Sequence, residues 1–115
     1  DPANRTFPRG LDVEIVPFAV LENAFQKATE KYQREHVMPY VYENTNKIFY
    51  YKNDKDYSMH RWTLDTPEDF ELISAIYHRL YKGKHDFYLR EILEVFEREP
   101  DLIKINAHIQ QKKIK

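Results

Sequence analysis

The chain has 115 residues, a formal net charge of −1 from 18 basic and 19 acidic side chains, and no cysteine. This balance argues against a dedicated nucleic-acid-binding protein, whose affinity comes from a basic face, and the lack of cysteine excludes disulfides and thiolate metal sites. No apolar run approaches the roughly 20 residues that cross a bilayer. We therefore expect a soluble, cytoplasmic protein with no nucleic-acid or membrane partner.

The first part of the chain predicts a strand followed by two helices. Residues 11–18 alternate between apolar and polar side chains, which is typical of a strand, and Pro17 ends it. From about 19 to 31, apolar residues recur at helical spacing. A second helix is predicted over 33–42, with Pro39 near its middle or at a break.

Two more strands and the strongest helix signal follow. Residues 47–51 and 59–64 are rich in aromatic and apolar side chains and predict strands. The next helix begins at Thr66, a good N-cap, with Pro67 at its first position and Asp69 completing a capping box.

The last part of the chain predicts one more helix and one more strand. Asp86 is a candidate cap for a helix through Phe96, and Pro100 stops it. Residues 102–109 predict a strand or an extended tail, and 112–115 form a basic end. The fold class is therefore α/β (α+β when isolated), with three to four strands and flanking helices. So few strands make an incomplete sheet, which predicts a single domain or a fragment of a larger one.

Charged side chains on the first predicted strand form one candidate site. Asp12 and Glu14 share a face of the strand, and Arg9 precedes them. One interpretation is a solvated face. The other is a pair of acceptors for the hydroxyls of a sugar-like ligand, with Arg9 anchoring a carboxylate or phosphate.

Arg34, Glu35 and His36 form a second charged group, on the predicted second helix. Consecutive charged residues on a helix usually face water. His36 is an acid–base candidate by its ordinary pKa, but the sequence provides no partner for it. The five histidines lack the spacing of zinc ligands, so no zinc site is expected.

The third candidate site lies at the end of the strand predicted over 59–64. Arg61 and Asp65 share one face of this strand, whereas Trp62 and Leu64 share the face that we assign to the core. Arg61 and Asp65 form either a structural ion pair or a ligand-facing pair. Carboxylates at strand ends often bind ligands, and Mg²⁺ takes one or two protein carboxylates plus substrate phosphates. Asp65 is therefore the candidate metal ligand.

Four segments, in this order, resemble the carboxyl-terminal half of the spore-coat-polysaccharide cytidylyltransferases, homologues of the CMP-KDO synthetases. They are residues 6–14 (TFPRGLDVE), 34–40 (REHVMPY), 61–70 (RWTLDTPEDF) and 105–108 (INAH). The resemblance covers nearly the whole chain.

This resemblance implies a nucleotide-diphospho-sugar transferase fold, a mixed sheet with helices on both sides. It implies transfer of a cytidylyl group from CTP to an acidic or related sugar, with Mg²⁺ as cofactor in the complete enzyme. The family's metal-binding aspartate corresponds to Asp65. The second metal aspartate and the nucleotide loop belong to the amino-terminal half, which agrees with the presence of only two glycines here. We therefore expect no catalytic side chain in this chain and no activity from it alone.

The resemblance also assigns the sugar side of the cleft and the assembly. The expected substrate-binding residues are Arg9, Asp12, Glu14, Arg34, Glu35, His36 and Arg61. The complete enzyme is expected to be a homodimer that serves cell-surface or spore-coat polysaccharide synthesis, and residues 1–115 are its acceptor-sugar and dimerisation half. The alternative is a non-catalytic dimerisation or sugar-binding module.

Overall fold

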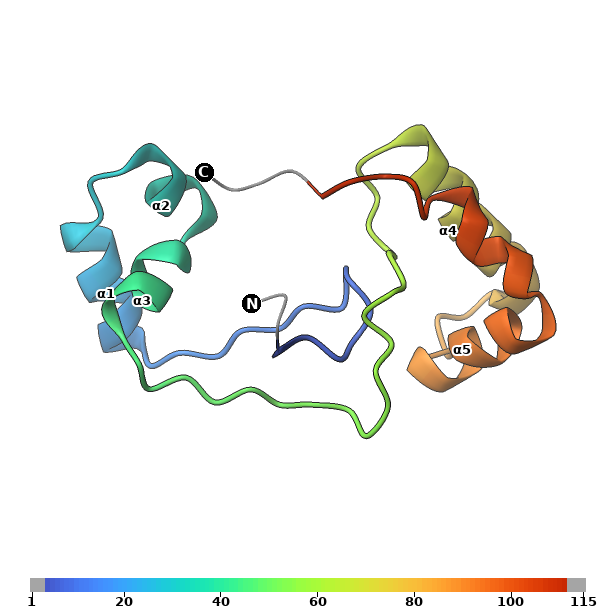
Figure 1. The fold of residues 1–115 in the computed structure, drawn as a ribbon, viewed down its shortest axis with the longest axis horizontal. Helices are drawn as coiled ribbons and strands as arrows, with labels where there is room; N and C mark the ends of the chain where they lie inside the picture. The colour runs from blue at the N-terminus through green and yellow to red at the C-terminus, as the bar shows by residue number, and fades with distance from the viewer. Residues whose placement is uncertain (1–3, 112–115) are drawn as a thin grey trace. The chain divides into compact units, whose positions relative to one another are not determined.

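The computed structural model describes residues 4–111, which form helices joined by extended segments (Figure 1). In chain order the elements are α1 (Phe18–Lys27), α2 (Lys31–His36), α3 (Pro39–Asn44), α4 (Pro67–Leu80), α5 (Leu89–Arg98) and the 3₁₀-helix η2 (Pro100–Ile105). No helix among residues 4–111 is long and apolar enough to cross a bilayer. The basic end predicted at 112–115 lies outside the described residues.

The chain divides into two compact units. The α4–α5 unit contains the residues up to Asp12 together with Lys52–Gln110, and the α1–α3 unit consists mainly of Val13–Tyr51. Each unit has its own helices and its own buried side chains.

The prediction of an α/β fold with three to four strands is wrong, because no strand forms within residues 4–111. The described chain contains one isolated parallel bridge, between Arg9 and Arg61. In it the Arg9 amide donates to the His60 carbonyl at 3.0 Å, and the Trp62 amide donates to the Arg9 carbonyl at 2.7 Å. Residues 59–64 thus form a single bridge, whereas a strand requires several consecutive bridges to a neighbouring strand.

The predicted strands 11–18 and 47–51 are extended chain, except that Phe18 begins α1. Several of their apolar side chains stay in solvent: Val13 is 83%, Ile15 92% and Phe49 88% exposed. Alternation shows that a segment can join a sheet, but the backbone groups of a strand need a neighbouring strand. Within the described residues these segments have no such neighbour, which explains the error.

The fourth predicted strand, 102–109, is also wrong, because it begins inside the helix η2. Pro100 occupies the first position of η2, where its missing N–H costs nothing. Leu102, Ile103 and Ile105 pack against the buried cluster of the unit. Their apolar character therefore reflects burial on a short helix.

The helix predictions are largely confirmed, with shifted ends. The predicted break at Pro39 occurs: α2 ends before Val37, which has a φ of 63°, and Pro39 opens α3. The helix predicted from Asp86 begins instead after Tyr88 and runs to Arg98.

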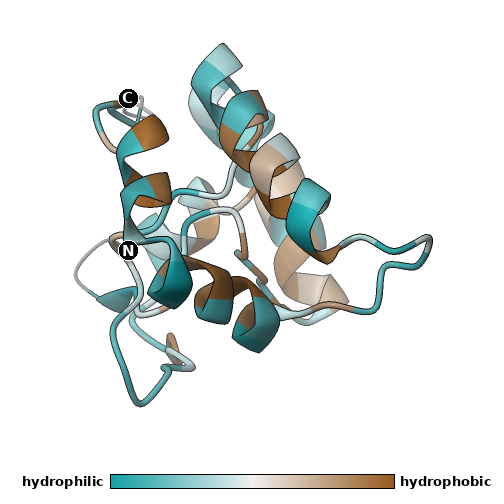
Figure 2. Cartoon of the chain, turned by 90° about the vertical axis from the view of Figure 1, so that its right-hand side faces the viewer, coloured by the Kyte–Doolittle hydropathy of each residue, from teal (hydrophilic) through white to brown (hydrophobic). Residues whose placement is uncertain are grey.

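Packing of α4 on α5 and η2 forms the core of the α4–α5 unit. Trp62, Leu72, Ile76 and Phe96 are its buried members, and the Trp62 and Phe96 rings stack with centroids 5.6 Å apart. Figure 2 shows helices that carry both apolar (brown) and polar (teal) stretches. Burial of these apolar side chains is the main force that holds α4 in place.

The α1–α3 unit has a smaller core and more polar connections. Ala24, Ala28 and Val41 are its buried apolar residues. The Gln33 side chain donates to a Glu43 oxygen at 2.6 Å, which joins α2 to α3.

His60 gives the core of the α4–α5 unit a pH dependence. Its ring lies against Phe96, with centroids 4.7 Å apart, and among the described residues its Nδ1 has no hydrogen-bond partner. Burial lowers the pKa of the His60 imidazole below 6.5, so the unfolded chain binds this proton more readily than the folded one. The folded state is therefore most stable above the pKa that His60 has in the unfolded chain. It loses stability as the pH falls below that value, because only the unfolded chain binds the proton readily.

We predict that the urea midpoint of the wild type decreases between pH 7.5 and pH 5.5, and that His60→Leu removes most of this decrease. The control His78→Gln, at an exposed position of α4, is expected to keep the wild-type dependence. Equal slopes for His60→Leu and wild type would show that His60 is protonated equally in both states.

Candidate functional site

The start of α4 positions the candidate site. Thr66 has an extended backbone, and its Oγ1 accepts the amide of Asp69 at 3.2 Å, which confirms the predicted N-cap. The predicted capping box also requires the Asp69 carboxylate to accept the amide of Thr66, and here its partner is a different amide. The Asp69 carboxylate reaches one residue further back and accepts the amide of Asp65 at 3.0 Å. The peptide that carries Asp65 is therefore fixed to the first turn of α4.

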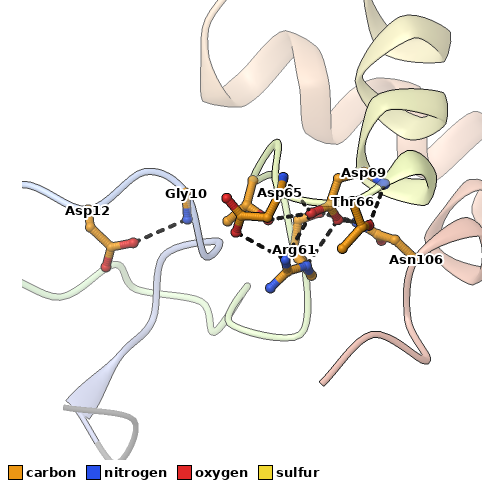
Figure 3. A network of polar contacts seen from close by, with 8 residues as sticks. Gly10, Asp12, Arg61, Asp65, Thr66, Asp69 and Asn106 are labelled. Atoms are coloured by element: carbon orange, nitrogen blue, oxygen red, sulfur yellow. Dashed lines mark hydrogen bonds and ion pairs between the residues drawn. The ribbon is translucent and has the colours of Figure 1, made fainter. Parts of the chain in front are cut away.

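Asp69 is the centre of a buried polar network (Figure 3). Its Oδ1 accepts Arg61 Nε at 3.0 Å and Asn106 Nδ2 at 2.8 Å. Its Oδ2 accepts Arg61 Nη2 at 2.8 Å, Thr63 Oγ1 at 2.9 Å and the Asp65 amide. The Asp69 side chain is fully buried, so these donors replace the water that it has lost.

The network fixes the charge of Asp69. Burial alone would raise the pKa of the Asp69 carboxyl, but hydrogen bonds from Arg61, Asn106, Asp65 and Thr63 outweigh it and hold the pKa well below its usual range. The hydrogen bond to Asp69 in turn raises the pKa of Arg61. Both shifts favour the charged forms of Asp69 and Arg61 at neutral pH.

Asp65 has the opposite environment. Its side chain is 64% exposed, and one carboxylate oxygen accepts Arg61 Nη2 at 3.2 Å. The sequence left open whether Arg61 and Asp65 pair with each other or face a ligand. The structure shows the ion pair and also shows that Asp65 presents its carboxylate to solvent.

An exposed carboxylate on a fixed backbone suits a hard divalent cation. Asp65 would supply one ligand, because no group of three or more His, Asp or Glu side chains within residues 4–111 is arranged to hold a metal. Substrate phosphates or other protein groups would complete the coordination. The chemistry of Asp65 thus fits part of a Mg²⁺ site.

Arg9 and Asp12 lie in the same unit as Asp65. Figure 3 shows Asp12 bonded to Gly10. The backbone of Arg9 forms the bridge to Arg61, and Gly10 follows with a φ of 105°. A Cβ at Gly10 would lie 2.3 Å from the Trp62 carbonyl oxygen, so only glycine fits this approach. The Asp12 carboxylate accepts the Gly10 amide at 3.1 Å and pairs with Arg5 at 2.5 Å.

The other predicted substrate-binding residues belong to the α1–α3 unit. Glu14 accepts a hydrogen bond from the Tyr42 hydroxyl. Arg34 donates to the carbonyls of Phe25 and Ala28, both at 3.1 Å, and thereby caps the end of α1. Glu35 and His36 are exposed. Their role in substrate binding stays a prediction, as does that of Arg9, Asp12 and Arg61.

Sequence reasoning missed Thr63, Asp69 and Asn106 as members of the network. Asp69 was predicted only as a helix cap, and Asn106 only as part of a resembling segment. The Asn106 side chain is almost fully buried and donates both to Asp69 and to the Arg61 carbonyl, the latter at 2.8 Å. The available signal was a polar residue inside an apolar run, which indicates a buried hydrogen-bonding partner.

Comparison with known proteins gives two matches and no matching family model. The chain is 37% identical over 107 residues to an uncharacterized protein of Methanocaldococcus jannaschii, covering 90% of this chain and 43% of that protein. It is also similar to the structure of a cytidylyltransferase from Leptospira borgpetersenii serovar Hardjo-bovis. The TM-score is 0.77 at 35% identity, over 95% of this chain and 44% of the other. The chain therefore has a cytidylyltransferase-like fold and spans less than half the length of each match.

We predict that Asp69→Asn lowers the free energy of unfolding by about 3–5 kcal/mol, because it leaves the nearly buried Arg61 without its main counter-charge. The control Asp65→Asn removes the same charge at an exposed position and should cost less than about 1 kcal/mol. Urea denaturation at pH 7 measures both variants.

The pH dependence has a defined sign. Folding lowers the pKa of Asp69, so the charged carboxylate stabilises the folded state. This contribution is fully present above the unfolded aspartate pKa of about 3.9 and is lost as the pH falls below it. The gap between wild type and Asp69→Asn should therefore narrow below about pH 4. Equal costs for Asp69→Asn and Asp65→Asn at pH 7 would contradict the central role of Asp69.

Proposed function

We propose that the chain is the acceptor-sugar portion of a cytidylyltransferase, which transfers a cytidylyl group from CTP to a sugar and releases pyrophosphate. The observation that carries this proposal is the exposed Asp65 carboxylate on a backbone fixed by Asp69. It lies in the segment 61–70, which resembles the cytidylyltransferases. The similarity to a solved cytidylyltransferase supports the nucleotidyltransferase-like function.

In the proposed reaction, a sugar hydroxyl oxygen bonds to the α-phosphorus of CTP as the bond from that phosphorus to pyrophosphate breaks. The hydroxyl proton passes to solvent. Mg²⁺, the proposed cofactor, supplies neutralisation of the charge on the phosphates when bound. Asp65 would hold this ion through its exposed carboxylate. The amino-terminal end of α4, adjacent to Asp65, adds a partial positive charge that favours the phosphates.

The charged residues named from the sequence are proposed to bind the sugar, and each is considered within its own unit. Arg9 and Arg61 are suited to a carboxylate on an acidic sugar, because a guanidinium matches a carboxylate with two hydrogen bonds. Asp12, Glu14 and Glu35 are suited to sugar hydroxyls, and Arg34 and His36 flank Glu35 in the sequence. Use of the product in spore-coat or cell-surface polysaccharide is part of the same proposal and rests on the resemblance alone.

The complete enzyme requires groups that this chain does not contain. The resemblance assigns the nucleotide loop and the second metal aspartate to the amino-terminal half, and the solved cytidylyltransferase is more than twice as long as the region matched. We therefore propose that the chain is inactive until it is joined to such a half.

Self-association is the second part of the proposal, and it is also the basis of the alternative function as a dimerisation module. An apolar groove of about 500 Å³ runs along α1 and is lined by Phe18, Leu21 and Phe25, with Glu22 and Arg34 among its other lining residues. Phe18 is 76% and Phe25 70% exposed. A groove that carries one acid and one base can be self-complementary in a two-fold contact, so the proposed occupant is a second copy.

The enzymatic proposal predicts activity in a chimera in which this chain follows the amino-terminal portion of the Leptospira cytidylyltransferase. Pyrophosphate release from CTP in the presence of acidic sugars should be detectable for the chimera and absent for the chain alone. Asp65→Asn should lower the Mg²⁺ affinity or the rate by about 10–100-fold.

The matched control is Glu68→Gln, which removes a neighbouring carboxylate from the first turn of α4. It is expected to keep most of the chimera's activity. An active chimera in which Asp65→Asn and Glu68→Gln behave alike would contradict the assigned role of Asp65.

For the dimer, we predict that the double variant Phe18→Ser, Phe25→Ser shifts the chain toward monomer in sedimentation velocity. The control Phe70→Ser removes a phenylalanine of similar exposure, 64%, from α4 and should leave the association unchanged. A wild type that stays monomeric at high concentration would contradict the proposed dimer.

A further inference from the structure

Asp69 controls both attachments of Asp65. It accepts the Asp65 amide at 3.0 Å, which fixes the backbone. It also binds Arg61, whose Nη2 is the donor to the Asp65 carboxylate at 3.2 Å. The position of the exposed Asp65 carboxylate therefore depends on the buried Asp69 in two ways. One is the hydrogen bond to the Asp65 amide, and the other is the Arg61 guanidinium that contacts both carboxylates.

Arg61 is a potential competitor of a cation at Asp65, because its guanidinium carries the same charge sign as a metal ion. Asp69 limits this competition by taking two N–H groups of Arg61 at 3.0 and 2.8 Å. Asp65 receives the longer contact, at 3.2 Å, and lies in solvent, where that contact is weak. The counter-charge of Arg61 is thus supplied mainly by Asp69, and the charge of Asp65 stays accessible.

Asn106 fixes the orientation of the Asp69 carboxylate. Its Nδ2 donates to Asp69 Oδ1 and to the Arg61 carbonyl, both at 2.8 Å. The side chain is 1% exposed, so water does not replace these bonds. With Arg61 Nε on the same oxygen, the carboxylate plane is held in the position that serves Arg61 and the Asp65 amide together.

We propose that Asp69, held by Asn106, is a positioning residue that keeps Arg61 from neutralising Asp65 and so preserves Asp65 as a ligand for a divalent cation. This inference rests on the proposed function, since it takes Asp65 as the ligand. It adds that the cation affinity of an exposed aspartate is set by a buried aspartate four residues later.

The test uses Mn²⁺ alone as the probe, added to the ¹⁵N-labelled chain. Paramagnetic broadening of the backbone amide signals of residues 63–66 reports binding at Asp65 without any enzymatic activity. Asp69→Asn is expected to weaken Mn²⁺ binding by about tenfold or more, in the range of supporting residues around metal ligands.

A second variant separates positioning from simple loss of structure. If Asp69 acts by supplying the main counter-charge of Arg61, adding Arg61→Gln to Asp69→Asn should restore part of the Mn²⁺ affinity, because the competing charge is gone. A double variant that binds no better than Asp69→Asn would overturn the inference. Leu72→Ala, buried on the same helix but outside the network, should destabilise the fold and leave the affinity of the folded chain unchanged.

The failure of the proposed function has a different signature. Broadening that persists in Asp65→Asn shows that Asp65 is no cation ligand, and then the proposed function fails. Broadening that is lost in Asp65→Asn but unchanged in Asp69→Asn refutes the positioning role alone. If Asp69→Asn does not fold, Asn106→Ala replaces it: a several-fold weaker binding supports the inference, and wild-type affinity overturns it.

Discussion

The burial of one charged carboxylate, that of Asp69, is the constraint on which the α4–α5 unit depends. A charge in the interior is costly unless enough donors surround it, and breaking such a group by removing a partner is strongly destabilising. Asp69 obtains its donors from the segment before α4 and from Asn106 after η2. These segments must therefore adopt one arrangement together, and the start of α4 becomes a fixed point of the unit.

The apolar core and this polar network support each other. Trp62 packs into the core, whereas its neighbours Arg61 and Thr63 donate to Asp69. Alternate residues of this short segment therefore belong to the core and to the polar network. The end of η2 repeats this division: Ile105, its last residue, packs against the core, and Asn106, which follows it, belongs to the network. A shift of either segment by one residue would exchange polar and apolar side chains. The network therefore specifies the register of the packing as well as its strength.

Local signals predicted the helices and the exposed half of the site. Thr66 and Pro67 start α4 as expected, and Pro39 breaks the chain where its geometry requires, because these effects act within a few residues. Asp65 and Arg61 could be paired because they lie four residues apart. Strand prediction failed for the opposite reason: the alternation at Val13 and Ile15 is real, but a strand depends on a distant partner that the sequence does not reveal. The bond from Asn106 to Asp69 spans 37 residues and was unpredictable on the same grounds.

The bridge between Arg9 and Arg61 makes the α1–α3 unit an insertion within the other unit. The chain leaves the α4–α5 unit, the host of the insertion, after Asp12 and re-enters it at Lys52. Thr6 holds the returning segment by accepting the amides of Asn53 and Tyr57. Loop-closure entropy grows only slowly with length, by roughly 0.6 kcal/mol per doubling, so such an insertion can be lengthened or exchanged at small cost. Asp65 and its supporting residues lie wholly in the host. Glu14 and Arg34, which lie in the inserted unit, can therefore vary without disturbing Asp65 and its supporting residues.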